Sequence, residues 1–453
     1  MTLKAVSATG QLGTGFLEES LKTAASGAAF IGCDAGSTDP GPFYLGSGKA
    51  QASRDAAKRD TRVMLEAGLD QGIPVLIGSA GTAGAKPHLE WMLEIVRELA
   101  RERHWHFKLA SINTELDRQY LLDQFDAGRI TPLDPAPDLT RDILIQAEHI
   151  VGMAGSEPFQ KALDTGAQVV VSGRCSDVSI FAAIPLRRNI PRGTAWHAGK
   201  ILECGAASVE RRLHPDSLVA ELDEEGFTVY PPNERMRCTP TSVVSHTLYE
   251  NSDPYHLIEP GGVLDTSECA YTAVGERAVR VTGSTFVPAD RYTVRLEGAV
   301  LAGFRSVALG GIRDPLVLRQ LDSYLGSLKE VVKKKVADSL ALSPVEYEVT
   351  WRVYGKDASM GALEPTPVIT GHEVGLLIDV LARTQSEASG ICSIAWHTAL
   401  HHPIPEYSGL ISNLAFPFSP PGIDAGAAYR FCINHVLTLD DPCGPFAITV
   451  EDI

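Results

Sequence analysis

The chain has 453 residues, of which 44% are hydrophobic and 21% are charged, as in an ordinary globular protein with two or three domains. Its formal net charge of −16 argues against a nucleic-acid partner, because a phosphate-binding surface usually carries an excess of basic residues. No window approaches roughly 18 consecutive apolar residues and no signal peptide is visible, so we expect neither a membrane span nor a membrane partner. The eight cysteines are widely scattered and contain no Cys-x-x-Cys pair, which predicts reduced thiols in a cytoplasmic protein.

In the first half of the chain, short apolar segments alternate with longer segments of helical periodicity. This alternation predicts an α/β fold over residues 1–217, with a parallel sheet covered by helices on both faces. Such sheets bind ligands at the carboxyl ends of their strands, at a topological switch point. The expected strands are 3–8, 28–32, 73–77, 106–112 and 167–171, and the expected helices are 16–25, 51–71, 87–102, 115–125 and 139–150.

From about Leu218 the pattern becomes β-rich and partly alternating. We expect a β-rich α+β region over residues 218–342 and a small α+β C-terminal domain over residues 343–453. The expected strands lie in FTVYPP, TSVVSHTLYE, RAVRVTGSTF, RYTVRLEGAVLAGFRSVALGG and EYEVTWRVYG; helices are expected at 315–340 and 372–386, and further strands at 391–397 and 427–439.

The loop CDAGSTDPGP (33–42) follows the second expected strand and contains two aspartates, Asp34 and Asp39, with Ser37 and Thr38 between them. Paired carboxylates can divide the acid and base roles of a reaction, or they can bind a hard cation. Asp, Ser and Gly are also common in turns for conformational reasons. We therefore take both aspartates as candidate catalytic residues and the two hydroxyl residues as candidate substrate ligands, with turn chemistry as the alternative.

The glycine-rich segment GSAGTAG (78–84) joins the third expected strand to a helix. Glycines let the backbone approach a ligand, and free N–H groups at a helix start favour an anion. The segment fits neither Gly-x-Gly-x-x-Gly nor the Walker lysine loop, so no nicotinamide or flavin fingerprint is present. A structural turn is the alternative, and it explains GQLGTG (10–15) about as well as ligand binding does. The candidate substrate-binding residues of this segment are Gly78, Ser79, Gly81, Thr82 and Gly84.

The segment GRCSD (173–177) has the pattern of a strand end followed by a capped helix. A guanidinium at this edge of a sheet suits a carboxylate or phosphate, so Arg174 is a candidate substrate-binding residue. Asp177 is a candidate catalytic residue, although a carboxylate in the first turn of a helix is also explained by the helix dipole.

The segment WHAGKILECGA (196–206) is expected to be helical. At 3.6 residues per turn, His197, Lys200 and Cys204 share one face, while Glu203 projects about a third of a turn away. Histidine is the natural acid–base residue near neutral pH. We take His197 and Glu203 as candidate catalytic residues and Lys200 as a candidate substrate ligand. The alternative is a core cysteine with a surface Lys200–Glu203 pair.

Taken together, these segments resemble the acyclic terpene utilisation (AtuA-type) family. GRCSDVSIF is similar to the family's Gly-Arg-x-(Ser/Thr)-Asp pattern at a strand end, whereas GSAGTAG differs from the Asn-Ala-Gly-Gly form that is commoner in terpene-pathway members. The resemblance implies breakdown of a small organic acid or its thioester, and a C-terminal part like the small second domain that accompanies this family. It runs through GSAGTAG, EPFQKALDTGAQVVVSGRCSDVSIFAA, AWHAGKILECGA and PTSVVSHTLYENSDPYHLIEPGGVLDTSE, and so covers most of the chain.

These observations predict a cytoplasmic catabolic enzyme whose substrate is a small carboxylate or an acyl-CoA. The expected reaction is that of a lyase or hydratase/dehydratase, with Arg174 and the GSAGTAG amides binding the anion. The candidates for moving a proton beside the carbonyl are Asp34, Asp39 and His197, with Asp177 and Glu203 as orienting partners or ligands of a divalent cation.

Two other functions stay open on the sequence. One is a hydrolase or deacylase that uses a loop carboxylate, Ser37 or Thr38. The other is a non-catalytic subunit that binds an acid or a partner protein. The sequence is also compatible with a homo-oligomer, and it names no cofactor.

Overall fold

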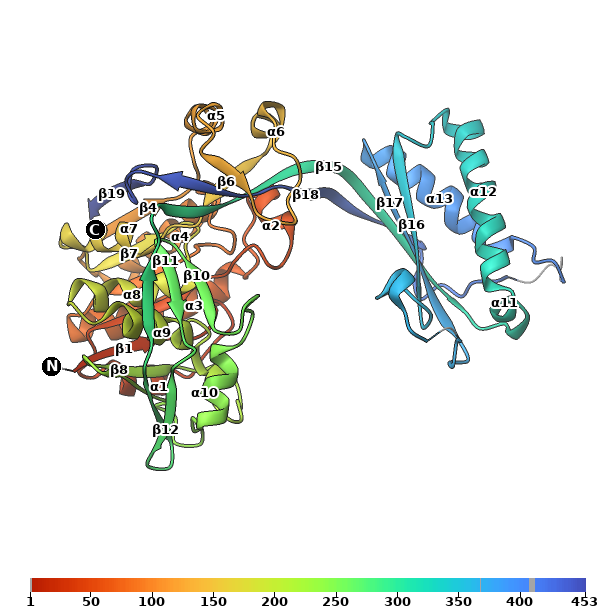
Figure 1. Ribbon diagram of the computed structural model, residues 1–453. Coiled ribbons are helices and arrows are strands. Elements are labelled where there is room, and N and C mark those ends of the chain that lie inside the picture. The colour runs from red at the N-terminus through yellow and green to blue at the C-terminus, as the bar shows by residue number, and fades with distance from the viewer. Residues whose placement is uncertain (1, 367, 407–411) are drawn as a thin grey trace. The chain divides into compact units, whose positions relative to one another are not determined.

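The computed structural model describes residues 2–366, 368–406 and 412–453. The chain forms two compact units: unit 1 comprises the residues up to Val300 together with Phe431–Ile453, and unit 2 comprises Leu301–Arg430 (Figure 1). This division differs from the domain boundaries expected near residues 217 and 342. Residues 218–300 belong to unit 1 because they extend its main sheet, and the chain returns to unit 1 after unit 2.

Over the described ranges, unit 1 is built on a ten-stranded mixed sheet in the order β12-β13-β9-β8-β1-β2-β3-β7-β4-β19. The five strands from β1 to β4 in this order run parallel, and antiparallel strands flank them on both sides. The predicted α/β class with parallel strands is thus confirmed. The strand bounds are Leu3–Ser7 (β1), Phe30–Asp34 (β2), Val75–Gly78 (β3), Lys108–Asn113 (β4), Val169–Ser172 (β7), Leu218–Leu222 (β8), Gly226–Tyr230 (β9), Ala270–Val274 (β12), Ala278–Thr282 (β13) and Ala447–Asp452 (β19).

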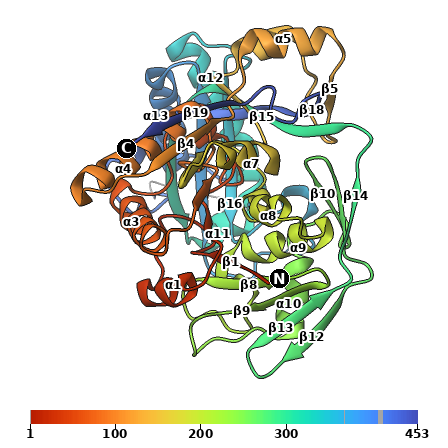
Figure 2. The same ribbon diagram turned by 90° about the vertical axis from the view of Figure 1, so that its left-hand side faces the viewer.

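Helices cover both faces of the parallel strands, and the strand side chains alternate between the two cores that result. In β7, Val169 and Val171 face one core, while Val170 faces the other. The first core receives α1 (Glu18–Ala25), α3 (Arg54–Gln71) and α4 (Lys86–Arg103), and the second receives α7 (Ser156–Asp164), α8 (Asp177–Arg187) and α9 (Arg192–Leu202), as Figure 2 shows.

Smaller elements complete unit 1. Strands β10 (His256–Glu259), β11 (Gly262–Asp265) and β14 (Thr285–Pro288) form an antiparallel sheet. The long strand β15 (Tyr292–Ile312) pairs through Leu296–Ala299 with β6 (His149–Gly152), and β18 (Gly422–Leu439) pairs through His435–Leu437 with β5 (Ile130–Pro132). The remaining helices are α2 (Pro42–Ser47), α5 (Arg118–Asp126), α6 (Arg141–Gln146), the 3-10 helix η1 (Gly205–Ser208) and α10 (Pro240–Thr247).

Unit 2 is an α+β layer with its own apolar core. The later part of β15 pairs with β17 (Val374–Ala382), which pairs in turn with β16 (Tyr347–Tyr354). Helices α12 (Leu321–Leu340) and α13 (Gln385–His401) lie against these strands in Figure 1 and share the core with them. The short helices α11 (Pro315–Arg319) and η2 (Gly361–Leu363) complete the described part of the unit.

Three sequence predictions are wrong at the level of secondary structure. The segment TSVVSHTLYE contains helix α10 instead of a strand, because Thr239 caps a helix that has Pro240 in its first turn. The expected helix at 372–386 is mostly strand β17, and the expected strand at 391–397 lies within helix α13. None of the helices described is long and apolar enough to cross a membrane.

Candidate functional site

A topological switch point lies between the neighbouring strands β3 and β7. The chain leaves β3 toward α4 on one face of the sheet and leaves β7 toward α8 on the other face. Loops that part in this way open the carboxyl edge of an α/β sheet to ligands. The two loops at this point are GSAGTAG and GRCSD, and Asp34 ends the adjacent strand β2. The structure therefore brings these three predicted elements together.

The GSAGTAG loop uses its backbone amides within the fold. The N–H groups of Ser79 and Ala80 donate to carbonyls of the β7 loop at 3.0 and 2.9 Å, and those of Thr82 and Gly84 donate within the loop itself. Four amides that were expected to bind an anion are therefore already engaged. The glycines instead allow the two loops to pack closely: a Cβ on Gly84 would lie 2.1 Å from the backbone nitrogen of Arg174.

Similar crowding explains two other glycines of this loop. A Cβ on Gly78 would lie 2.3 Å from a methyl carbon of Ile180, and a Cβ on Gly81 would lie 2.8 Å from the Cβ of His88.

Thr82 adopts a φ of 97°, which is rare for a β-branched residue, and its hydroxyl accepts a hydrogen bond from the backbone N–H of Gln51 at 3.1 Å. Backbone strain of this kind clusters at functional sites, so it favours a functional role for the loop.

Arg174 lies at the centre of a buried ion network. Its Nε donates to Glu297 at 2.9 Å, and its terminal nitrogen donates to Asp177 at 3.1 Å and to the Ser79 hydroxyl at 3.2 Å. Burial alone would lower the pKa of Arg174, but the charges of Glu297 and Asp177 outweigh it and raise that pKa. Two carboxylates already neutralise the guanidinium. The prediction that Arg174 binds a substrate anion thus finds no support in this geometry.

Asp34 and Asp177 are two carboxyl groups at the switch point whose pKa values are both raised. Burial raises the pKa of Asp34 well above its ordinary value, and the charge of Asp177 raises it further. One oxygen of Asp34 accepts from the Gly36 amide at 3.0 Å, whereas its other oxygen is buried without a hydrogen-bond partner among the described residues. Burial also raises the pKa of Asp177, but the contact with Arg174 opposes that effect. We infer that Asp34 holds the proton and Asp177 carries the charge.

The residues between Asp34 and Asp39 divide into a buried and an exposed part. Thr38 is buried and donates to Glu297 at 2.7 Å, so its hydroxyl supports the Arg174 network. Ser37 donates to exposed Asp39 at 2.6 Å, and the Asp39 amide donates back to the Ser37 hydroxyl at 3.1 Å. This pair has the geometry of the local turn that was the alternative interpretation.

A second acid–base group adjoins the first. Lys200 and Glu203 are buried and form an ion pair of 2.6 Å, instead of the surface pair considered as an alternative. Burial raises the pKa of Glu203 to about 7, with Lys200 opposing and Asp177 adding to the shift. Burial likewise raises the pKa of Glu259 to about 8, although the Ser176 hydroxyl donates to it at 2.5 Å.

His197 lies away from these groups, in the core beneath the antiparallel strands. Its two ring nitrogens contact the Ser284 and Thr247 hydroxyls at 2.7 and 3.0 Å, and its ring packs edge-on against Phe227 and Tyr271. Burial lowers its pKa to about 3, so the ring is neutral near pH 7. The ring is thus buried and held by hydrogen bonds on both sides, and the catalytic role expected for His197 stays a prediction.

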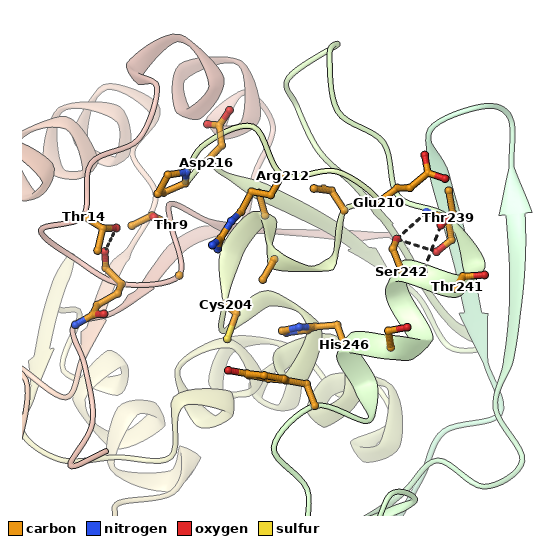
Figure 3. A pocket seen from close by; sticks show the side chains of 18 residues that line it. Thr9, Thr14, Cys204, Glu210, Arg212, Asp216, Thr239, Thr241, Ser242 and His246 are labelled. Carbon is orange, nitrogen blue, oxygen red and sulfur yellow. Dashed lines mark hydrogen bonds between the residues drawn. The ribbon is translucent and has the colours of Figure 1, made fainter. Parts of the chain in front are cut away.

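A pocket of about 1080 Å³ opens at the carboxyl end of β1, at the same edge of the sheet. Its lining includes Gly10, Gln11 and Thr14 of the GQLGTG segment (Figure 3). Across from them lie Cys204, which follows Glu203 directly, and His246 on α10. Cys204 is therefore part of the pocket wall instead of the core residue considered as an alternative.

Three site residues were missed by the sequence analysis. Glu297 lies in an alternating strand segment, and Glu259 lies in a segment noted for family resemblance alone; neither belongs to a local motif. His246 was read as part of a strand. The Thr-Pro pair before it signals a helix start and could have corrected that reading.

Among the described residues, one group has the donors and spacing to bind a metal ion: Glu203, Cys204 and His246, whose donor atoms all lie within 4.8 Å of one another. Asp177, the other residue suggested as a ligand of a divalent cation, belongs to no such cluster among the described residues.

Comparison with known proteins identifies the chain at the level of its family. The model of the family described as "Acyclic terpene utilisation family protein AtuA" matches residues 55–409 of the 453. No curated protein and no solved structure matches the chain. The matched range contains both loops of the switch point, the Lys200–Glu203 pair and Glu297. The chain belongs to the acyclic terpene utilisation family AtuA.

Proposed function

We propose that this protein is a catabolic enzyme of acyclic terpene utilisation that acts on a small organic carboxylate or its thioester by lyase or hydratase/dehydratase chemistry. Family membership supports the catabolic role. The observation that carries the reaction class is the pairing of Asp34 with Asp177 at the β3/β7 switch point, beside a strained glycine loop.

The two aspartates have different environments, and such a difference divides acid from base. Asp34 is buried and has an oxygen without a partner, so as a neutral acid it can donate a proton or a hydrogen bond to a carbonyl oxygen. Asp177 has a side chain that is 31% exposed and is held by Arg174, so as an ionised base it can remove a proton from the adjacent carbon. This division gives the enolate-type chemistry that lyases and hydratases use.

The charge balance of the site favours a thioester over a free carboxylate. Arg174 is already paired with Asp177 and Glu297, and Lys200 is already paired with Glu203. A neutral thioester carbonyl needs no counter-ion, whereas a free carboxylate would have to compete with these carboxylates for the two cations.

Proton exchange tests the proposal on simple thioesters, so the natural substrate need not be identified first. We expect the enzyme to wash deuterium from D₂O into the carbon next to the carbonyl of branched acyl-CoA thioesters, as followed by NMR. The substitutions D34N and D177N should each slow this exchange by about 10²–10⁴-fold, the usual contribution of a general acid or base. The matched control is D39N, which changes an exposed aspartate of the same loop; it removes only one of the charges that raise the pKa of Asp177, so it should slow exchange far less than D34N or D177N. Undiminished exchange in both D34N and D177N would refute the assignment.

A hydrolase is the second candidate, and the 2.6 Å hydrogen bond from Ser37 to Asp39 favours it, because a carboxylate can activate a hydroxyl at that distance. The two candidates predict opposite results for D39N, which should abolish a hydrolase of this kind. Incorporation of ¹⁸O from labelled water into a released acid would identify hydrolysis. Saturable thioester binding without exchange or hydrolysis would instead support a non-catalytic subunit.

A further inference from the structure

Three side chains with metal-binding donors converge where α9, η1 and α10 meet. Glu203 is the C-cap of α9, Cys204 precedes η1, and His246 lies near the end of α10. One carboxylate oxygen, the thiol sulfur and one imidazole nitrogen all lie within 4.8 Å of one another. Two of these residues line the pocket, and Figure 3 shows the imidazole of His246 pointing toward Cys204.

The hydrogen bonding of His246 leaves one nitrogen available. Its Nε2 is buried without a hydrogen-bond partner among the described residues. The backbone of Lys200 lies close enough to the ring to raise the pKa of His246 against the effect of burial. Histidines that bind metals commonly donate their other ring N–H to a backbone carbonyl, which fixes the ring and its tautomer. The residue is 6% exposed, so leaving Nε2 without a partner is costly.

We propose that Glu203, Cys204 and His246 bind a divalent transition-metal ion of the Zn²⁺ class, with the fourth coordination position open to the pocket. Mixed oxygen, sulfur and nitrogen donors suit this class of ion, and three protein ligands with one open position are typical of a catalytic centre. Metal–ligand bonds of about 2.0–2.3 Å place tetrahedral donors roughly 3.3–3.8 Å apart, so small side-chain rotations would close the present spacing. The proposal is independent of the roles assigned to Asp34 and Asp177.

Binding changes the protonation of Cys204. Burial raises the pKa of its thiol, so without metal the S–H bond is intact at neutral pH. When the metal binds, the metal–sulfur bond forms, the S–H bond breaks and the proton passes to solvent. Lys200 opposes binding, because its ammonium is 2.6 Å from the Glu203 carboxylate and repels a second cation.

Cobalt(II) is the probe, because a cobalt–thiolate bond gives a charge-transfer absorption that needs no substrate and no turnover. We expect the full-length protein, stripped with a chelator, to bind one equivalent of Co²⁺ with this absorption and to release it to Zn²⁺. C204S should abolish the absorption and weaken binding by more than about a hundredfold, since loss of a ligand exceeds the effect of outer residues. H246A should weaken binding to a similar extent, with circular dichroism confirming that each variant is folded.

The matched control is C269S. Cys269 also lies beside a histidine, with its sulfur 3.7 Å from His197, but it belongs to no metal-binding cluster of the described chain. The C269S variant should retain the wild-type cobalt spectrum. K200M should bind Co²⁺ more tightly than wild type, because it removes the competing charge. A charge-transfer band that survives in C204S, or an absence of stoichiometric binding in wild type, would overturn the proposal.

Discussion

Replacing Arg174 with methionine should destabilise unit 1 strongly, because Arg174 is the buried counter-ion of Glu297. The two side chains are 5% and 3% exposed, and Nε lies 2.9 Å from the carboxylate. Removing one partner of such a pair leaves an uncompensated buried charge, which costs about 3–5 kcal/mol. The double variant R174M/E297Q leaves neither of these two charges buried without its partner, so it should lose less than the sum of the two single variants.

The same carboxylate provides the control. Arg295 also faces Glu297, at 3.5 Å, but its side chain is 45% exposed, so R295M should cost less than about 1 kcal/mol. Stability is measured from urea unfolding at neutral pH, followed by tryptophan fluorescence, to which buried Trp196 contributes, and by circular dichroism. If R174M were no less stable than R295M, or if the double variant lost the full sum, Arg174 would not be the counter-ion of Glu297.

Three further predictions concern the fold and its pH dependence. Burial lowers the pKa of His197 to about 3, so between pH 6.5 and 3 the unfolded chain binds a proton at this residue and the folded chain does not. The urea midpoint of wild type should therefore fall more steeply than that of H197Q as pH is lowered from 6.5 to 3. Burial raises the pKa of Glu259 to about 8, so the stability that the folded state gains from the neutral carboxyl is lost as pH rises through that value. E259Q should therefore be more stable than wild type at about pH 9. G84A should lower the free energy of unfolding more than G27A does, as measured by thermal unfolding. Both glycines have φ near +68°, a strain of about 1–3 kcal/mol for alanine, but only at Gly84 would the new Cβ collide with the backbone of Arg174.

The convergence of Asp34, the GSAGTAG loop and Arg174 was predictable, because each follows a buried apolar strand and parallel strands end at one edge. The contacts that these groups make within the fold were not predictable. Arg174 is neutralised by Glu297, which lies far along the chain on β15, and no local pattern announces that contact. The hydrogen bonds of the glycine loop likewise depend on the register between β3 and β7.

The errors in secondary structure arise because a short apolar segment fits a helix and a strand almost equally well. Strand β17 alternates strictly between buried and half-buried residues, but apolar residues occupy both kinds of position, so the sequence does not show this period of two. Helix α13 contains β-branched and aromatic residues, yet it buries residues three or four apart. Its capping box, Thr384 with Glu387, was a local signal that could have placed its start.

The pairing of β4 with β19 has a consequence for the order of events during synthesis. Beside this pair, Arg97 on α4 forms an ion pair with Glu451, 354 residues further along the chain. Strand β4 therefore leaves the ribosome long before its neighbour exists, and one edge of it stays unpaired while unit 2 is being made. An unpaired strand edge invites association with other chains. Until β19 is made, the growing chain thus presents an open strand edge with which other chains can associate.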